Sequence, residues 1–273
     1  QDWLGVGLVF INDKAGASGL TTSGAKLGAT YHLALNKKGT TTISLGAQYG
    51  KMGRKLDRDK LQFQDGFNNG SYNIPSSQDY GQIATDNVNY TDIDAGVVLS
   101  SRLNKRMDFN IGFAMYHIPE PNYGLVTAGG GTNPNPNPNP TPATGNSDFA
   151  RRAAFHGQLN AALTDRFTLS PTFFYQTLSG ADEITVQALG GYLFDPVKEI
   201  TINFGLGYRL GDAIQALAGA KYKSLTVGLA YDINTSDLNS ASNYRGGFEI
   251  AANYIVKIYK NPVTKTKLLC PRF

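Results

Sequence analysis

Apolar and polar residues alternate strictly along many segments of this chain of 273 residues, and this period of two constrains the fold more than any motif does. Residues 41–51 show it clearly, with one face of Thr, Ser, Gly and Gln and another of Ile43, Leu45, Ala47 and Tyr49. Residues 200–209 and 225–232 repeat the pattern. Successive side chains of a β-strand point to opposite faces, so these segments are predicted to be strands with one apolar and one polar face. Such strands suit a wall between hydrocarbon and a water-filled lumen.

The composition agrees with a membrane barrel. Charged residues make up 17% of the chain, against about 25% in a typical soluble domain, while 31 glycines and 11% aromatic residues are present. The net charge of +4 is too small to indicate a nucleic-acid-binding protein. No apolar run reaches the length of about 18 residues that a transmembrane helix needs, so strands are expected to cross the membrane.

Twelve strands are predicted, at residues 2–10, 26–36, 41–51, 92–102, 108–116, 151–163, 167–176, 184–194, 200–209, 214–222, 225–232 and 245–258. Five tight turns are expected, at 37–40, 103–107, 164–166, 195–199 and 223–224. They alternate with connections that are mostly longer, at 11–25, 52–91, 117–150, 177–183, 210–213 and 233–244, of which only 210–213 is short. Outer-membrane barrels have short periplasmic turns and longer extracellular loops. The pattern predicts extracellular loops at 52–91 and 117–150 and a periplasmic C-terminus. A soluble β-sandwich, the alternative fold, would explain the alternation but not the one-sided loop lengths.

The same reasoning predicts where individual side chains point. In the last strand, Glu249, Asn253 and Lys257 share a face and are expected in the lumen, because a Lys at the bilayer midplane costs about 2–4 kcal/mol. His156 is expected to share the lumen with Gln158 and Asn160. Aromatic girdles at the membrane interfaces are predicted from Phe10, Tyr49, Tyr116, Phe167, Tyr208, Tyr231 and Tyr254.

The sequence offers little chemistry. Its three His residues have no metal-ligand spacing, and no catalytic residue, cofactor or metal is predicted. The run NPNPNPNPTP at 133–142 lacks the amide donors of a strand and is expected to be a loop tip. We divide the chain into a barrel at 1–259 and a basic tail at 260–273. The tail is interpreted as a docking peptide, a part of the barrel seal or a frayed end.

Several short segments together resemble the PorP/SprF family of type IX secretion system membrane proteins. They are FINDKAG (10–16), YHLAL (31–35), LGAQYG (45–50), KLQF (60–63), YRLGDA (208–213), VGLAYDIN (227–234), RGGFEI (245–250) and CPRF (270–273). The resemblance implies an outer-membrane β-barrel of the Bacteroidota, related in shape to the fourteen-stranded fatty-acid transporter barrels. Family members usually begin with a signal peptide and a further stretch, so an upstream hairpin is expected to raise twelve strands to fourteen.

The resemblance also implies a role in type IX secretion and gliding, and no catalytic residues. Partners would be outer-membrane lipid, a secreted protein with a type B C-terminal domain, and the periplasmic ring and motor components. Aromatic and Arg residues often anchor such contacts. Candidate contact residues are therefore Tyr72, Tyr80, Tyr123, Arg272 and Phe273. The alternative function is a channel for hydrophobic small molecules, resembling the fatty-acid transporters.

Overall fold

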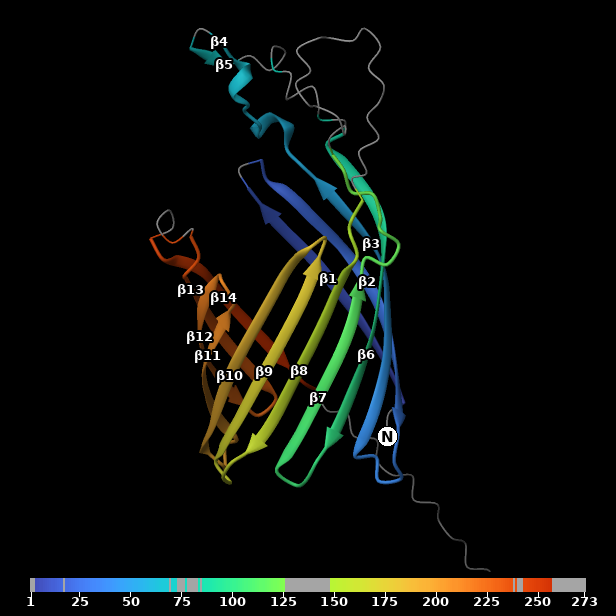
Figure 1. The fold of residues 1–273 in the computed structure, drawn as a ribbon, viewed down its shortest axis with the longest axis vertical. Coiled ribbons are helices and arrows are strands. Elements are labelled where there is room, and N and C mark those ends of the chain that lie inside the picture. Colours follow the sequence, from blue (N-terminus) through green and yellow to red (C-terminus); the bar gives the residue numbers. More distant parts are fainter. Residues whose placement is uncertain are drawn as a thin grey trace, which may run out of the picture.

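The computed structural model describes residues 3–16, 18–68, 70–72, 77, 83, 85–125, 148–237, 239 and 243–256, with only the backbone at 68 and 72. Twelve strands form one antiparallel sheet that curves into a barrel wall, with β1 and β14 at its edges (Figure 1). They are β1 (Leu4–Ala15), β2 (Leu20–Ala34), β3 (Thr41–Lys55), β6 (Asn87–Arg102), β7 (Met107–Tyr116), β8 (Arg152–Ala162), β9 (Phe167–Leu178), β10 (Ala181–Asp195), β11 (Ile200–Arg209), β12 (Ala213–Tyr222), β13 (Leu225–Asn234) and β14 (Arg245–Tyr254). Each strand pairs with the next long strand along the chain. The predicted number of strands and their antiparallel order are confirmed.

The two faces of the sheet differ as the alternation predicts. Val6, Phe10 and Leu206 point outward and are 72%, 77% and 67% exposed. The opposite, concave face carries the buried charged residues Lys26 and Asp92. The apolar side chains therefore coat the outside of the wall instead of filling a dry core, and the β-sandwich alternative is wrong. No helix among the described residues is long and apolar enough to span a membrane.

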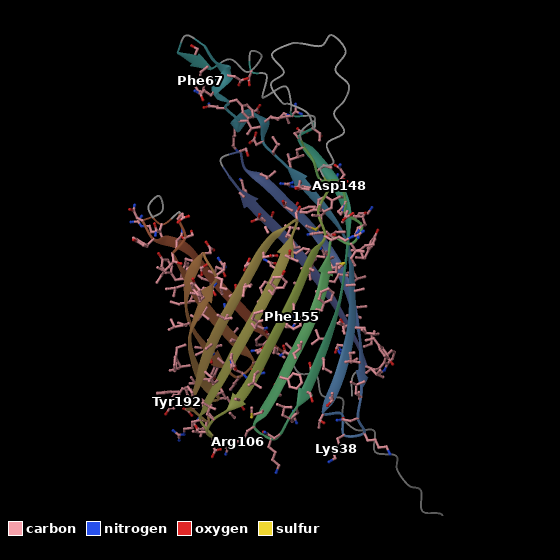
Figure 2. The ribbon with its side chains drawn as sticks, viewed as in Figure 1. Lys38, Phe67, Arg106, Asp148, Phe155 and Tyr192 are labelled. Atoms are coloured by element: carbon pink, nitrogen blue, oxygen red, sulfur yellow. The ribbon has the colours of Figure 1, made fainter. Side chains whose placement is uncertain are left out.

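Five tight turns lie at one end of the barrel, as predicted, at residues 35–40, 103–106, 163–166, 196–199 and 223–224. Figure 2 shows Lys38 and Arg106 at this turn end and Phe67 and Asp148 at the opposite, loop end. Three long connections leave the loop end, at 56–86, 117–151 and 235–244.

Two connections that were predicted to be longer are tight turns instead, at 16–19 and 179–180, whereas the connection predicted to be short at 210–213 is indeed a tight turn, at 210–212. The strands continue beyond the alternating part of the sequence, because polar residues such as Asp13 and Thr22 still pair across β1 and β2. Ser179 and Gly180 have φ of 51° and 85°, the two positive values of a type I′ hairpin turn. Alternation ends where the apolar belt ends, whereas backbone pairing continues into water.

The inward prediction for β14 is confirmed where the structure describes it, because Glu249 faces Ala230 and Asn253 faces Thr226 on the inner face. Lys257 lies outside the described residues. The girdle prediction is wrong for Tyr116, which pairs with Arg152 and lies under its guanidinium at 4.2 Å, on the inner face. Tyr116 was included because it ends a strand, but it shares the inward face of β7 with Gly112 and Ala114.

The connection 56–86 contains short elements that were not predicted. They are two 3-10 turns, η1 (Arg58–Lys60) and η2 (Gln64–Gly66), and the strand pair β4 (Phe67–Asn68) and β5 (Ser71–Tyr72). Leu56, Ile83 and Leu125 form a buried apolar cluster with Leu20, Leu61, Phe63 and Val88 packed against it. This cluster is the apolar core of the described residues, and it joins the bases of the two longest connections at the loop end.

Candidate functional site

The candidate site lies on the inner wall, where β6 extends beyond β7. β7 ends at Tyr116, whereas β6 continues toward the loop end from Ala95 to Asn87 without a strand on that side. The chain turns at His117, whose φ is 57°, and residues 117–125 then follow β6. Ile118 donates its amide to Ile93, and Leu125 accepts from Thr85. The base of the connection 117–151 therefore lies against the wall of the barrel.

Lys26 bridges three strands at this level. In the register of the sheet, Lys26 of β2 is opposite Gly50 of β3, and Gly50 is opposite Asp92 of β6. A Cβ at Gly50 would lie 2.6 Å from Lys26 Cγ, so only glycine leaves room for the Lys26 side chain to cross β3. Lys26 Nζ lies 2.6 Å from Asp92 Oδ2 and 2.6 Å from Asp94 Oδ2. The ammonium therefore links β2 to β6 across the intervening strand.

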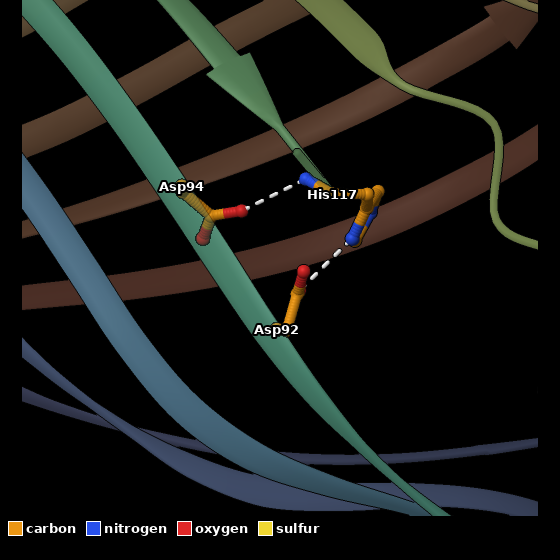
Figure 3. Close-up of side chains that lie close together, drawn as sticks. All are labelled: Asp92, Asp94 and His117. Carbon is orange, nitrogen blue, oxygen red and sulfur yellow. Dashed lines mark hydrogen bonds and ion pairs between the residues drawn. The ribbon is translucent and has the colours of Figure 1, made fainter. Parts of the chain in front are cut away.

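His117 completes this group, which we call the charge clamp (Lys26, Asp92, Asp94 and His117). Its Nδ1 lies 2.9 Å from Asp92 Oδ2, and its backbone amide donates to Asp94 Oδ1 at 3.1 Å (Figure 3). Lys26, Asp92 and Asp94 are 6%, 1% and 5% exposed. Removing one partner from a buried ion pair costs about 3–5 kcal/mol, since the other charge is left uncompensated. The clamp thus fixes the start of the segment 117–125 to β6.

Asp92, Asp94 and His117 also bring possible metal ligands together, with ligand atoms within 4.8 Å of one another. The two carboxylate oxygens that converge already hold the Lys26 ammonium at hydrogen-bond distance. A metal ion would have to displace this cation. The residues therefore suit an ion-pair network better than a metal centre.

A stack of side chains rises from the clamp toward the loop end. His117 stacks on Phe149 at 4.4 Å, Phe149 stacks on Tyr123 at 3.9 Å, and Arg54 lies 4.5 Å from the Tyr123 ring. Phe149 also donates its amide to Pro121. The stack joins β3 to both ends of the connection 117–151. Together, the clamp and the stack fix the point from which this connection leaves the barrel.

The model of the PorP/SprF family, type IX secretion system membrane proteins, matches residues 1–254. This chain belongs to that family. PorP/SprF membership confirms the predicted resemblance and places the chain among secretion-system membrane proteins. No functionally curated protein matches the sequence.

Several solved structures are similar to this PorP/SprF protein. The toluene transporter TbuX of Ralstonia pickettii is 10% identical, with a TM-score of 0.48 over 86% of this chain and 73% of TbuX. Two mutants of the Rhodopseudomonas blastica porin have TM-scores of 0.33 and 0.32 at 11% and 10% identity. Each covers 92% of this chain and 99% of the porin. With TM-scores below 0.5, none of these similarities carries an argument about fold or function.

Of the five predicted contact residues of the PorP/SprF chain, only Tyr72 and Tyr123 lie within the described residues. Tyr123 is half-buried in the stack, and Tyr72 lies in β5 with only its backbone described. Tyr80, Arg272 and Phe273 lie outside the described residues. Their role in binding stays a prediction.

The charge clamp was not predicted from the sequence. The available signal was the presence of Lys26, Asp92 and Asp94 at inward positions of two predicted strands. The alternation of apolar and polar residues does not reveal that these side chains meet across a third strand. The inward prediction for His156, Gln158 and Asn160 is confirmed. His156 lies across Gly112, Asn110 donates to Gln158 at 3.4 Å, and Asn160 donates to Asp108 at 2.9 Å.

A second charged group lies on the inner face of β10–β13. Arg209 Nη1 lies 2.9 Å from Asp212 and 3.1 Å from Asp232, and Arg209 Nε is 3.5 Å from Glu183. Its side chain is 28% exposed, so water reaches it. The backbone carbonyl of Asp212 accepts from the amides of Thr235 and Ser236, so this group lies at the start of the connection 235–244, whereas the charge clamp lies at the start of 117–151.

Proposed function

We propose that this PorP/SprF protein is a non-enzymatic outer-membrane barrel of the type IX secretion and gliding machinery. Its loop end would face the cell exterior and hold a secreted surface protein with a type B C-terminal domain. Its turn end and C-terminus would lie in the periplasm, near the ring and motor components. The barrel between them would be a rigid mount in outer-membrane lipid.

The observation that carries this proposal is the fixed base of the connection 117–151. Disordered segments lose conformational entropy when they bind, whereas a loop with an ordered base loses less. The charge clamp and the stack order this base from inside the wall, through contacts at 2.6 to 4.5 Å. This arrangement supports a role in presenting a loop to a partner, and Tyr72, Tyr80, Tyr123, Arg272 and Phe273 remain the proposed contacts.

The test is to replace residues 126–147 with a short Gly-Ser linker and purify the barrel from cells in which type IX secretion is active. We expect the barrel to reach the outer membrane and to show heat-modifiable migration, but to lose the co-purified surface protein. A variant with the same linker in place of 236–242 is the matched control. Full retention of the surface protein by the 126–147 variant would contradict the proposal.

A channel for hydrophobic small molecules is the second candidate. A groove of about 440 Å³ on the β1–β3 and β6–β8 part of the wall includes the small inward residues Gly5, Gly46 and Gly96. Polar inward residues flank it, among them Gln48, Asp94 and His156. These side chains suit water better than an acyl chain, so we favour the first function. Bound lipid in the purified barrel, without a protein partner, would favour the second.

A further inference from the structure

Three lysines form a patch on the outer face of β1 and β3 at the loop end. Lys14 is opposite Thr21 of β2, which in turn is opposite Lys55 of β3. Lys51 lies on the same outward face of β3, four residues before Lys55. We call Lys14, Lys51 and Lys55 the lysine patch. All three side chains are exposed, on the face that also carries the apolar belt.

The patch begins where the apolar belt ends. Phe10 of β1 and Tyr49 of β3 are the last large apolar residues of the belt on these strands, at 77% and 55% exposed. Lys51 follows Tyr49 by two residues, and Lys14 and Lys55 lie farther along the strands. A strand rises about 3.3 Å per residue, so the three ammonium groups lie at different distances from the edge of the hydrocarbon, with Lys51 nearest to it. This is the depth range of lipid headgroups.

The opposite part of the wall lacks such a patch within the described residues. At the loop end of β9–β13, the outward residues are Tyr175, Thr177, Asp182, Tyr208, Ile214 and Ile233. Asp182 accepts a hydrogen bond from the Tyr175 hydroxyl at 3.1 Å. The lysine patch is therefore one-sided, as a binding site would be, and is not a uniform ring around the barrel.

The patch lysines are not neutralised by the protein in its described part. No carboxylate there lies within ion-pair distance of Lys14, Lys51 or Lys55, whereas Lys60 pairs with Asp57 at 2.7 Å. The hydrogen bond from Lys60 holds the pKa of Asp57 below its ordinary value, so Asp57 is charged and already engaged. The three ammonium groups thus form no ion pair within the described residues, although the charge of Lys55 also acts on Asp57.

Lys14 and Lys55 also line a polar cavity of about 550 Å³ between the β1–β2 turn and the segment 55–60. Its wall contains the carboxylates of Asp57, Asp59 and Asp86, which Arg58 and Lys60 oppose. Counted with Lys51, the cavity and the patch keep a net charge of +2. The cavity has room for a phosphate or an acidic sugar beside the two lysines.

We infer that the lysine patch binds lipopolysaccharide of the outer leaflet. Acyl chains would lie along the outward residues Leu8, Leu27 and Tyr49, and the phosphates and acidic sugars would contact Lys51, Lys14 and Lys55 at increasing distance from the hydrocarbon. A lipid with anionic groups at several depths fits lysines at several depths. The inference rests on the proposed outer-membrane location with the loop end outside, and does not depend on any protein partner.

The experiment compares the full chain with the variant K14Q/K51Q/K55Q, both purified in mild detergent and titrated with purified lipopolysaccharide under native mass spectrometry. The matched control is K38Q/K105Q/K198Q, which removes three exposed lysines from the turn end. Each lysine near an anionic headgroup changes affinity by about fivefold, so we expect the patch variant to bind lipopolysaccharide at least about tenfold more weakly. The control variant should bind as the unaltered protein does.

Three results would overturn the inference: no binding by the unaltered protein, equal losses in the two variants, or equally strong binding of phosphatidylglycerol at the patch. The unaltered fold of each variant is checked by heat-modifiable migration. Because the assay contains no secretion component, its outcome is separate from that of the loop replacement. Lipopolysaccharide binding by a barrel that retains no surface protein would support this inference and contradict the proposed function.

Discussion

Inward-facing cations are buried in one half of the barrel wall and accessible to water in the other. In the half that contains β2, β3 and β6, strands of 15, 15 and 16 residues carry Lys26, whose side chain is 8% exposed. In the half that contains β11–β13, strands of 10 residues carry Arg209, whose side chain is 28% exposed. The base of the connection 117–151 covers the first cation and not the second. The same lumen thus contains one charged group that is structural and one that water screens.

The largest effect is expected for Lys26→Met. The substitution leaves Asp92 and Asp94 buried beside each other without their ammonium, which should lower the free energy of unfolding by about 3–5 kcal/mol. Urea unfolding in lipid vesicles, followed by the fluorescence of Trp3, measures the change. Trp3 is the single tryptophan of the chain. A loss no greater than that of the Arg209 variant below would show that the buried and the exposed groups are energetically alike.

A smaller effect is expected for Gly50→Ala. The new Cβ would lie 2.6 Å from Lys26 Cγ and against the backbone of Ala25, so the Lys26 side chain must leave its path across β3. Overpacking of this kind costs about 1–3 kcal/mol. Gly228→Ala is the matched control, because Gly228 is also an inward strand glycine and a Cβ there meets nothing within 4 Å. Equal unfolding free energies for the two variants would contradict the proposed path of Lys26.

The smallest effect is expected for Arg209→Met. Water can solvate Asp212, Asp232 and Glu183 after the guanidinium is removed, so we expect a loss of about 1 kcal/mol or less. The same Trp3 unfolding assay measures it, and added salt should reduce the difference further. A loss of several kcal/mol would mean that this group is as structural as the charge clamp.

The sequence predicted the fold because the side-chain period of a strand is two, and a barrel in lipid separates its faces by polarity. Ile43 and Leu45 point outward and Ser44 points inward for this reason alone. Strand ends were harder to predict, because Asp13 and Thr22 continue the pairing of β1 and β2 beyond the apolar belt, where the lipid no longer imposes alternation.

The candidate site was beyond sequence reasoning for a different reason. Alternation tells which face Lys26 and Asp92 share, but not that Gly50 lies between them in register. That register depends on how β3 pairs with β6. The two strands are joined by the long connection 56–86, and its length does not indicate which residues of β3 and β6 are opposite each other. His117 was missed because it lies in an irregular turn, where no periodic pattern applies.

The path of Lys26 over Gly50 has a consequence for the segment between β3 and β6. A side-chain tie from β2 to β6 holds these strands in alignment from within the lumen, independently of the chain that connects them outside. The alignment of β2, β3 and β6 therefore does not depend on the connection 56–86 alone. With the loop end outside, as proposed, a foreign epitope inserted between residues 69 and 82 should be displayed at the cell surface without disturbing the barrel.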